Sequence, residues 1–159
     1  MILDSDIEID TSMPYTISSP LAATRSNPTR VRVRDADETN YDYVYGESTN
    51  FKIIGELTLD TPSLDDTWKV GATDKIVDWS YKGDLEDVKI YISYDGSDPD
   101  GLLTTESASD GLWTWSTGVP NEVSSTVKVK VTAADAETDT YVVSDTFLIV
   151  GGFLSLIHI

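Results

Sequence analysis

The chain of 159 residues has no cysteine and a single histidine, His158. Without cysteine, neither a disulfide framework nor a thiolate metal site can form, and one histidine cannot supply the paired imidazole ligands of the common zinc sites. The absence of disulfides leaves the compartment open, because many secreted proteins also lack cysteine.

Targeting and membrane-spanning segments are also missing from the sequence. Residues 1–6 have neither the basic region nor the apolar region of a signal peptide. No stretch approaches the roughly 20 apolar residues of a membrane-spanning helix. We expect any export signal of the parent protein to lie outside this sequence.

Positive charge is scarce. Only 11 lysines and arginines stand against 28 aspartates and glutamates, which gives a formal net charge of −17. An acidic surface of this strength repels phosphate backbones and anionic lipid headgroups. We therefore expect no nucleic-acid partner and no direct membrane insertion. Calcium binding is compatible with this negative charge. A simpler interpretation is that the charge keeps a long exposed protein soluble.

Apolar residues make up 40% of the chain, and they alternate with polar residues rather than following a helical period. The clearest case is residues 87–94, where Val88, Ile90 and Ile92 share one face. Short strands separated by turns predict an all-β fold, an immunoglobulin-like antiparallel β-sandwich with Trp79, Trp113 and Trp115 in its core. The expected strands are residues 56–60, 73–81, 87–94, 102–106, 112–116, 125–132 and 141–150.

The motifs of the common catalytic classes do not occur. There is no G-x-S-x-G nucleophile motif and no phosphate-binding loop. Glycosidases need two carboxylates about 5–10 Å apart beside a sugar cleft, and a small sandwich has no deep cleft. We therefore expect no enzymatic activity.

An internal repeat divides the chain. Residues 31–55 align with residues 127–151 without a gap, at an offset of 96 and with seven identities. Upstream, residues 15–18 match residues 113–116 at an offset of 98, which fits a loop of variable length. Unless the match is a chance similarity between strand pairs, residues 1–55 are the C-terminal part of one module and residues 56–151 are a complete module.

The tail, residues 152–159, has a different character. Leu154–Ile159 resembles the translated end of a sequencing-library adaptor, so we expect it to be an artefact of a fragmentary, metagenomic-type assembly. The alternative is a short apolar strand that opens a further module. In either case His158 is not a candidate catalytic or metal residue.

Five segments carry a family resemblance: residues 68–71, 77–79, 88–96, 110–115 and 143–149. Their succession resembles the Ser/Thr-rich, GPI-anchored cell-wall family domain of fungi and its bacterial and viral relatives. The resemblance implies a secreted, repeated sandwich module of fibronectin III-like kind, and it carries no catalytic residue. The first copy departs from the pattern, with Tyr15 and Ile17 where the family has aromatics at both positions.

Acidic loops are the candidate metal sites. Asp95, Asp98 and Asp100 share one turn, and calcium binds six to eight oxygen ligands of this kind. The spacing is not that of an EF-hand, so a solvated turn remains the alternative. Two further acidic groups have the same status: Asp35, Asp37 and Glu38, and, near the module junction, Glu56, Asp65 and Asp66.

Tyrosines are the candidate ligand-binding residues. Tyr81, Tyr91 and Tyr94 lie on or beside two predicted strands, where their rings could stack on sugars. Tyr41, Tyr43 and Tyr45 alternate in the first copy. The alternative is that tyrosines suit half-buried strand positions.

These patterns predict a structural spacer or adhesion (adhesin) repeat of a large extracellular, cell-surface or virion-surface protein. Its partners would be neighbouring modules of the same chain. Two alternatives stay open: a glycan-binding module that recognises cell-wall or surface glycan through its tyrosines, and a stalk module made rigid by calcium. No other cofactor is expected.

Overall fold

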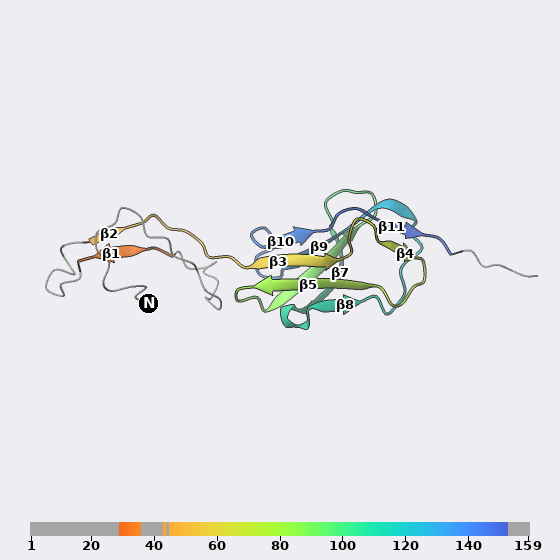
Figure 1. Cartoon of the computed structure of the whole chain (residues 1–159), viewed down its shortest axis with the longest axis horizontal. Coiled ribbons are helices and arrows are strands. Elements are labelled where there is room, and N and C mark those ends of the chain that lie inside the picture. The colour runs from red at the N-terminus through yellow and green to blue at the C-terminus, as the bar shows by residue number, and fades with distance from the viewer. Residues whose placement is uncertain (1–28, 36–42, 44, 153–159) are drawn as a thin grey trace, which may run out of the picture. The chain divides into compact units, whose positions relative to one another are not determined.

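A computed structural model describes residues 29–35, 43 and 45–152, and this part of the chain is all-β (Figure 1). The chain divides into two compact units, unit 1 (Met1–Ile54) and unit 2 (Gly55–Ile159). Among the described residues, the one helical element is the short 3₁₀ turn η2 (Ala108–Asp110). The same residues include no helix with the length and apolar character needed to span a membrane. Several predictions fall outside the described residues: those on residues 15–18, Asp37, Glu38, Tyr41 and the tail 154–159.

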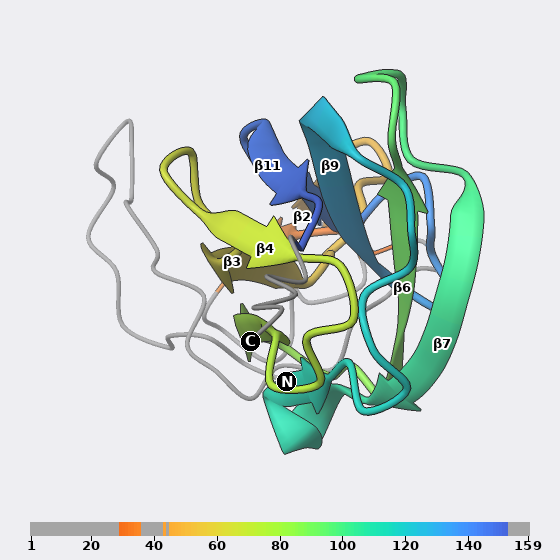
Figure 2. The same ribbon diagram turned by 90° about the vertical axis from the view of Figure 1, so that its right-hand side faces the viewer.

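Unit 2 contains two sheets (Figure 2). One has three strands in the order β3-β5-β8, and the other has the order β4-β11-β9-β6-β7, with β10 also paired to β9. All neighbouring strands are antiparallel except β4 and β11, which are parallel. The strands are β3 (Glu56–Thr61), β4 (Thr67–Lys69), β5 (Ile76–Lys82), β6 (Asp87–Ser93), β7 (Gly101–Ser107), β8 (Leu112–Thr114), β9 (Ser124–Ala133), β10 (Tyr141–Val143) and β11 (Phe147–Val150).

Both sheets contribute side chains to one core. Of the three tryptophans predicted to anchor it, Trp79 and Trp115 are buried, whereas Trp113 is only partly buried. The prediction missed Trp68, which is 2% exposed and packs with its ring centroid 4.7 Å from that of Phe147. Trp68 lies on the three-residue strand β4, which is too short for alternation to reveal its inward direction.

The predicted final strand, residues 141–150, is two strands. β10 and β11 both pair with β9, and Ser144 lies at the break between them. The Ser144 N–H donates to the Val129 carbonyl at 2.8 Å, and the Val129 N–H donates to the Ser144 hydroxyl at 3.0 Å. A side-chain oxygen thus replaces a backbone acceptor, and the regular ladder ends there.

Unit 1 contains the paired strands β1 (Arg32–Arg34) and β2 (Tyr45–Glu47). They are antiparallel, with Arg32 opposite Glu47. In unit 2, Lys130 on β9 lies opposite Val143 on β10 in the equivalent position. The second strands of the two pairs differ by 96 in residue number, but the first strands differ by 98.

A serine at the end of the second strand makes the same three hydrogen bonds in both units. Ser48 donates its N–H to the Val31 carbonyl at 2.9 Å and accepts the Val31 N–H at 3.0 Å, as Ser144 does with Val129. Each serine hydroxyl also donates to the carbonyl of the following residue, at 2.8 Å and 2.7 Å. These contacts make Val31 the equivalent of Val129.

The gapless alignment of the repeat was therefore wrong in its first strand. Val31 and Val33 correspond to Val129 and Val131, not to Val127 and Val129. Because valines recur at every second position, a shift of two residues preserves the identities and hides the error. The difference of two residues falls in the loop between the strands, and the first strand then shares the offset of 98 found upstream.

Gly55, which the repeat aligns with Gly151, is buried within unit 2. Its carbonyl accepts a hydrogen bond from the Thr140 hydroxyl at 3.4 Å. A Cβ at this position would lie 2.8 Å from the Leu85 side chain and 3.1 Å from the Lys82 carbonyl. Only glycine fits here without displacing its neighbours.

Substituting the core ring at Phe147 tests this packing. Phe147→Ala removes a fully buried side chain, and we expect a loss of about 3–5 kcal/mol in the free energy of unfolding. Leu148→Ala, on the opposite and exposed face of β11, should cost about 1 kcal/mol or less. Denaturant unfolding followed by tryptophan fluorescence measures both, and equal losses would contradict the assigned core.

Candidate functional site

The turn that carries the predicted calcium ligands holds its carboxylates apart. Asp95 Oδ1 accepts hydrogen bonds from the Ser93 hydroxyl at 2.8 Å and from the Ser97 N–H at 3.0 Å. Asp98 pairs instead with Lys130, with its Oδ2 2.8 Å from Nζ. Asp95 therefore stabilises the turn itself, whereas Asp98 ties the turn to β9.

Two of the other acidic candidates, Glu56 and Asp66, also have partners. Glu56 pairs with Lys82 at 2.7 Å, and Asp66 accepts the Ser63 N–H at 2.7 Å. Within residues 29–35, 43 and 45–152, no three acidic, histidine or cysteine side chains are grouped so that they could hold a metal ion. The calcium hypothesis, including Asp100, gains no support from this geometry and stays a prediction.

The three candidate tyrosines do not form one platform. Tyr91 occupies an outward-facing position of β6, between the buried residues Ile90 and Ile92. Tyr94 is partly buried against the core, and burial raises its pKa. Tyr81 lies near the end of β5 in the other sheet. A glycan site made from all three rings is therefore not assembled, and the glycan hypothesis stays a prediction.

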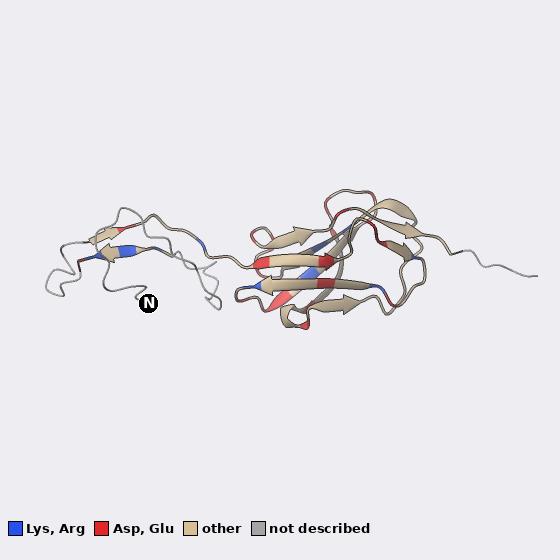
Figure 3. Cartoon of the chain, viewed as in Figure 1, with Lys and Arg blue, Asp and Glu red and all other residues tan. Residues whose placement is uncertain are grey.

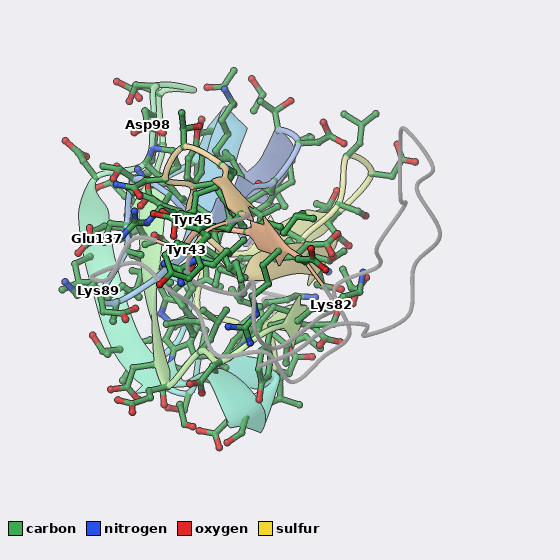
Figure 4. The ribbon with its side chains drawn as sticks, turned by 90° about the vertical axis from the view of Figure 1, so that its left-hand side faces the viewer. Tyr43, Tyr45, Lys82, Lys89, Asp98 and Glu137 are labelled. Carbon is green, nitrogen blue, oxygen red and sulfur yellow. The ribbon has the colours of Figure 1, made fainter. Side chains whose placement is uncertain are left out.

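Tyr91 belongs instead to a polar network on the outward face of the larger sheet. Lys89 Nζ lies 2.5 Å from Glu137 (Figure 4), and the Tyr91 hydroxyl donates to the same carboxylate at 3.1 Å. The Lys130 ammonium lies 5.5 Å from the centre of the Tyr91 ring and also pairs with Asp98. The network thus links β6 and β9 to the loops that follow each of them.

The pKa shifts in this network are explained by the contacts that its members make with one another and by burial. The hydrogen bond from Lys89, followed by that from Tyr91, lowers the pKa of Glu137. The hydrogen bond to Glu137 raises the pKa of Lys89, and burial followed by that carboxylate raises the pKa of Tyr91. The hydroxyl and one side of the ring of Tyr91 are already in use, which leaves less of this side chain for a sugar.

Sequence reasoning missed Glu137 and the two lysines. Strand alternation places Lys89 and Lys130 outward, but Glu137 is 48 residues from Lys89 and lies in a loop. With Lys128, these lysines give the outward face of β6 and β9 a cluster of positive charge, whereas acidic residues are spread over both sheets and their loops (Figure 3). No local sequence signal pairs Glu137 with them.

Comparisons with known proteins give no family. No protein-family model matches the chain, and no curated protein matches it. The function is therefore inferred from the fold, the repeat and the contacts described above.

The Asp95 turn makes a prediction about acid stability. Hydrogen bonds from the side chain and N–H of Ser97, and then from Ser93, lower the pKa of Asp95 to about 2 from its ordinary 3.8. A carboxyl with a lowered pKa stabilises the fold above its ordinary pKa, and that contribution disappears as the pH falls towards 2. We expect Asp95→Asn to lower the urea midpoint at pH 7 and to have little effect at pH 2.

The matched control is Asp100→Asn, an exposed aspartate of the same turn. Its urea midpoint should stay close to that of the unmodified chain at both pH values. Two results would contradict the role assigned to this turn. One is a carboxyl NMR titration that gives Asp95 an ordinary pKa, and the other is an equal loss of urea midpoint for Asp95→Asn at pH 7 and pH 2.

Proposed function

We propose that the chain is part of an array of immunoglobulin-like β-sandwich modules that acts as a spacer or adhesion repeat of a large surface protein. In this proposal unit 1 contains the C-terminal part of one module and unit 2 is a complete module. The protein lies outside the cell or on a virion, as the resemblance to the Ser/Thr-rich, GPI-anchored cell-wall family implies. Its role is mechanical and involves no catalysis.

The observation that carries the proposal is the shared pairing of the two units. The same antiparallel strands, in the same register, end in the same serine hydrogen bonds at Ser48 and Ser144. A chance likeness between two strand pairs would not reproduce three side-chain and backbone contacts. Repetition of one structural unit along a chain is typical of arrays whose stability is supplied unit by unit.

The sandwich assignment is supported by the way the sheets share a core. Leu57 and Trp79 come from the three-stranded sheet, and Val129 and Phe147 come from the larger one; all four are buried in one cluster. β3 pairs in the first sheet, whereas β4, the next strand along the chain, pairs in the second. Such a change of sheet near the start of a module is compatible with two sheets packed face to face.

The parallel pair of β4 and β11 supports a mechanical role. The Leu148 N–H donates to the Asp66 carbonyl at 3.1 Å, and the Val70 N–H donates to the Val150 carbonyl at 3.0 Å. One strand lies near the start of unit 2 and the other near its end. Tension on the chain therefore pulls the two strands in opposite directions along their axes and loads their hydrogen bonds together rather than one by one.

Single-molecule pulling on the chain tests this role. Val70→Pro removes the N–H that bonds to Val150, and we expect it to lower the force at which unit 2 unfolds, because forced unfolding is governed by the unfolding rate. The control is Thr105→Pro on the edge strand β7, which pairs only with β6 and lies outside the β4–β11 pair.

The comparison is made at matched thermal stability. The unfolding force should fall more for Val70→Pro than for Thr105→Pro when the melting temperature of the two variants is lowered by the same amount. If the two variants lose force in proportion to their melting temperatures, the β4–β11 pair is not a mechanical clamp, and the load-bearing role loses its support.

A further inference from the structure

Unit 1 has an apolar face that is exposed, although its equivalent in unit 2 is fully buried. The exposed fractions are 42% for Val31 and 69% for Val33. Their equivalents, Val129 and Val131, are 0% exposed.

Phe51 completes this face, which we call the acceptor face (Val31, Val33 and Phe51). Phe51 pairs with Thr29 as Phe147 pairs with Val127, so the two phenylalanines are equivalent. Phe51 is 38% exposed and Phe147 is 0% exposed. Phe51 is therefore more exposed than its equivalent in unit 2, as Val31 and Val33 are.

One position on the opposite side of the strand pair has the same exposure in both units. Tyr45 and Tyr141 are equivalent and lie next to the inward-facing positions. Their exposed fractions are nearly equal, 54% and 55%. At this outward position the two units are equally exposed, whereas at the three inward positions Val31, Val33 and Phe51 unit 1 is the more exposed.

Unit 2 shows the chemistry of that cover. Trp68 packs on Phe147, and β4 runs parallel to β11 with Thr67 opposite Leu148. Leu57 and Trp79, on β3 and β5, belong to the same buried cluster. The segment of residues 56–82 thus supplies an extended, apolar cover centred on a tryptophan.

We propose that the acceptor face of unit 1 binds an extended donor segment with the sequence chemistry of residues 56–82. The donor lies parallel to the segment around Phe51, with its tryptophan on the Phe51 ring, as in β-strand addition. This proposal rests on the proposed array of modules, in which the donor is the opening part of the acceptor's own module. The copy of this segment in the present chain is held in unit 2, so the occupant is an additional copy.

A binding experiment uses the full chain and a dye-labelled synthetic peptide of residues 56–82. We expect saturable one-to-one binding with a Kd below about 1 mM. Val33→Asp places a charge on the acceptor face and should weaken binding at least about tenfold. Asn50→Asp adds the same charge at an exposed position outside the face and should leave the Kd unchanged.

The peptide is varied in the same way. A peptide with Trp68→Asp should also bind at least about tenfold more weakly, because the ring that covers Phe51 is lost. No saturable binding by about 1 mM peptide, or an equal Kd for the Val33→Asp chain and the unmodified chain, would overturn the proposal.

Disulfide trapping tests the register of the donor on unit 1. The chain has no cysteine of its own, so only the introduced cysteines can react. Lys52 is the equivalent of Leu148, so a Lys52→Cys chain should form a disulfide with a Thr67→Cys peptide. An Asp60→Cys peptide is the control and should not react. Equal trapping of both peptides would overturn the register.

A Leu148→Cys chain distinguishes the two possible acceptors. If the Thr67→Cys peptide is trapped by Leu148→Cys rather than by Lys52→Cys, the peptide has displaced the opening strands of unit 2, and the acceptor face is not its site. A chain that resists force as proposed and still fails to bind the peptide refutes this inference alone, so the two proposals fail separately.

Discussion

The inward row of valines on β9 is the constraint on which unit 2 depends. Val127, Val129 and Val131 are all fully buried, and β9 pairs with β6 along one edge and with β10 and β11 along the other. Because side chains alternate along a strand, burying these three valines places Lys128 and Lys130 outward. The outward network around Tyr91 is thus a consequence of the core packing.

Much of the fold could be predicted from alternation alone. The patterns of residues 87–94 and 125–132 identified β6 and β9 to within one residue at each end, because each strand has one buried and one polar face. Alternation could not identify Trp68 as a core residue. Its direction is set by pairing with Ile149, eighty-one positions further along the chain.

The break at Ser144 was also missed, although the polar residues Ser144, Asp145 and Thr146 separate two apolar runs. What stops the ladder is one hydroxyl that bonds to the Val129 N–H, and this contact exists only once β9 is in place. The same holds for the acidic turn. The Asp95-Gly96 dipeptide predicted the turn itself, but the partner of Asp98 is a lysine thirty-two residues away. Composition suggested a cation site, whereas cross-strand pairing decided which charges meet.

The repeat shows how pattern and register can disagree. Two strands with the same alternating valines align equally well at two offsets, and the pairing register and the hydrogen bonds of Ser48 and Ser144 distinguish them. Once the register is fixed, residues of the two units can be compared one by one. That comparison identifies Val31, Val33 and Phe51 as exposed positions whose equivalents in unit 2 are buried.

The enclosure of Gly55 has a practical consequence for dissecting this protein. A boundary drawn from the repeat alone would cut between Gly55 and Glu56 and discard a residue whose carbonyl is bonded to Thr140. Recombinant versions of unit 2 should therefore start at or before Gly55. In shuffled or fused versions of the gene, this glycine should travel with the residues that follow it.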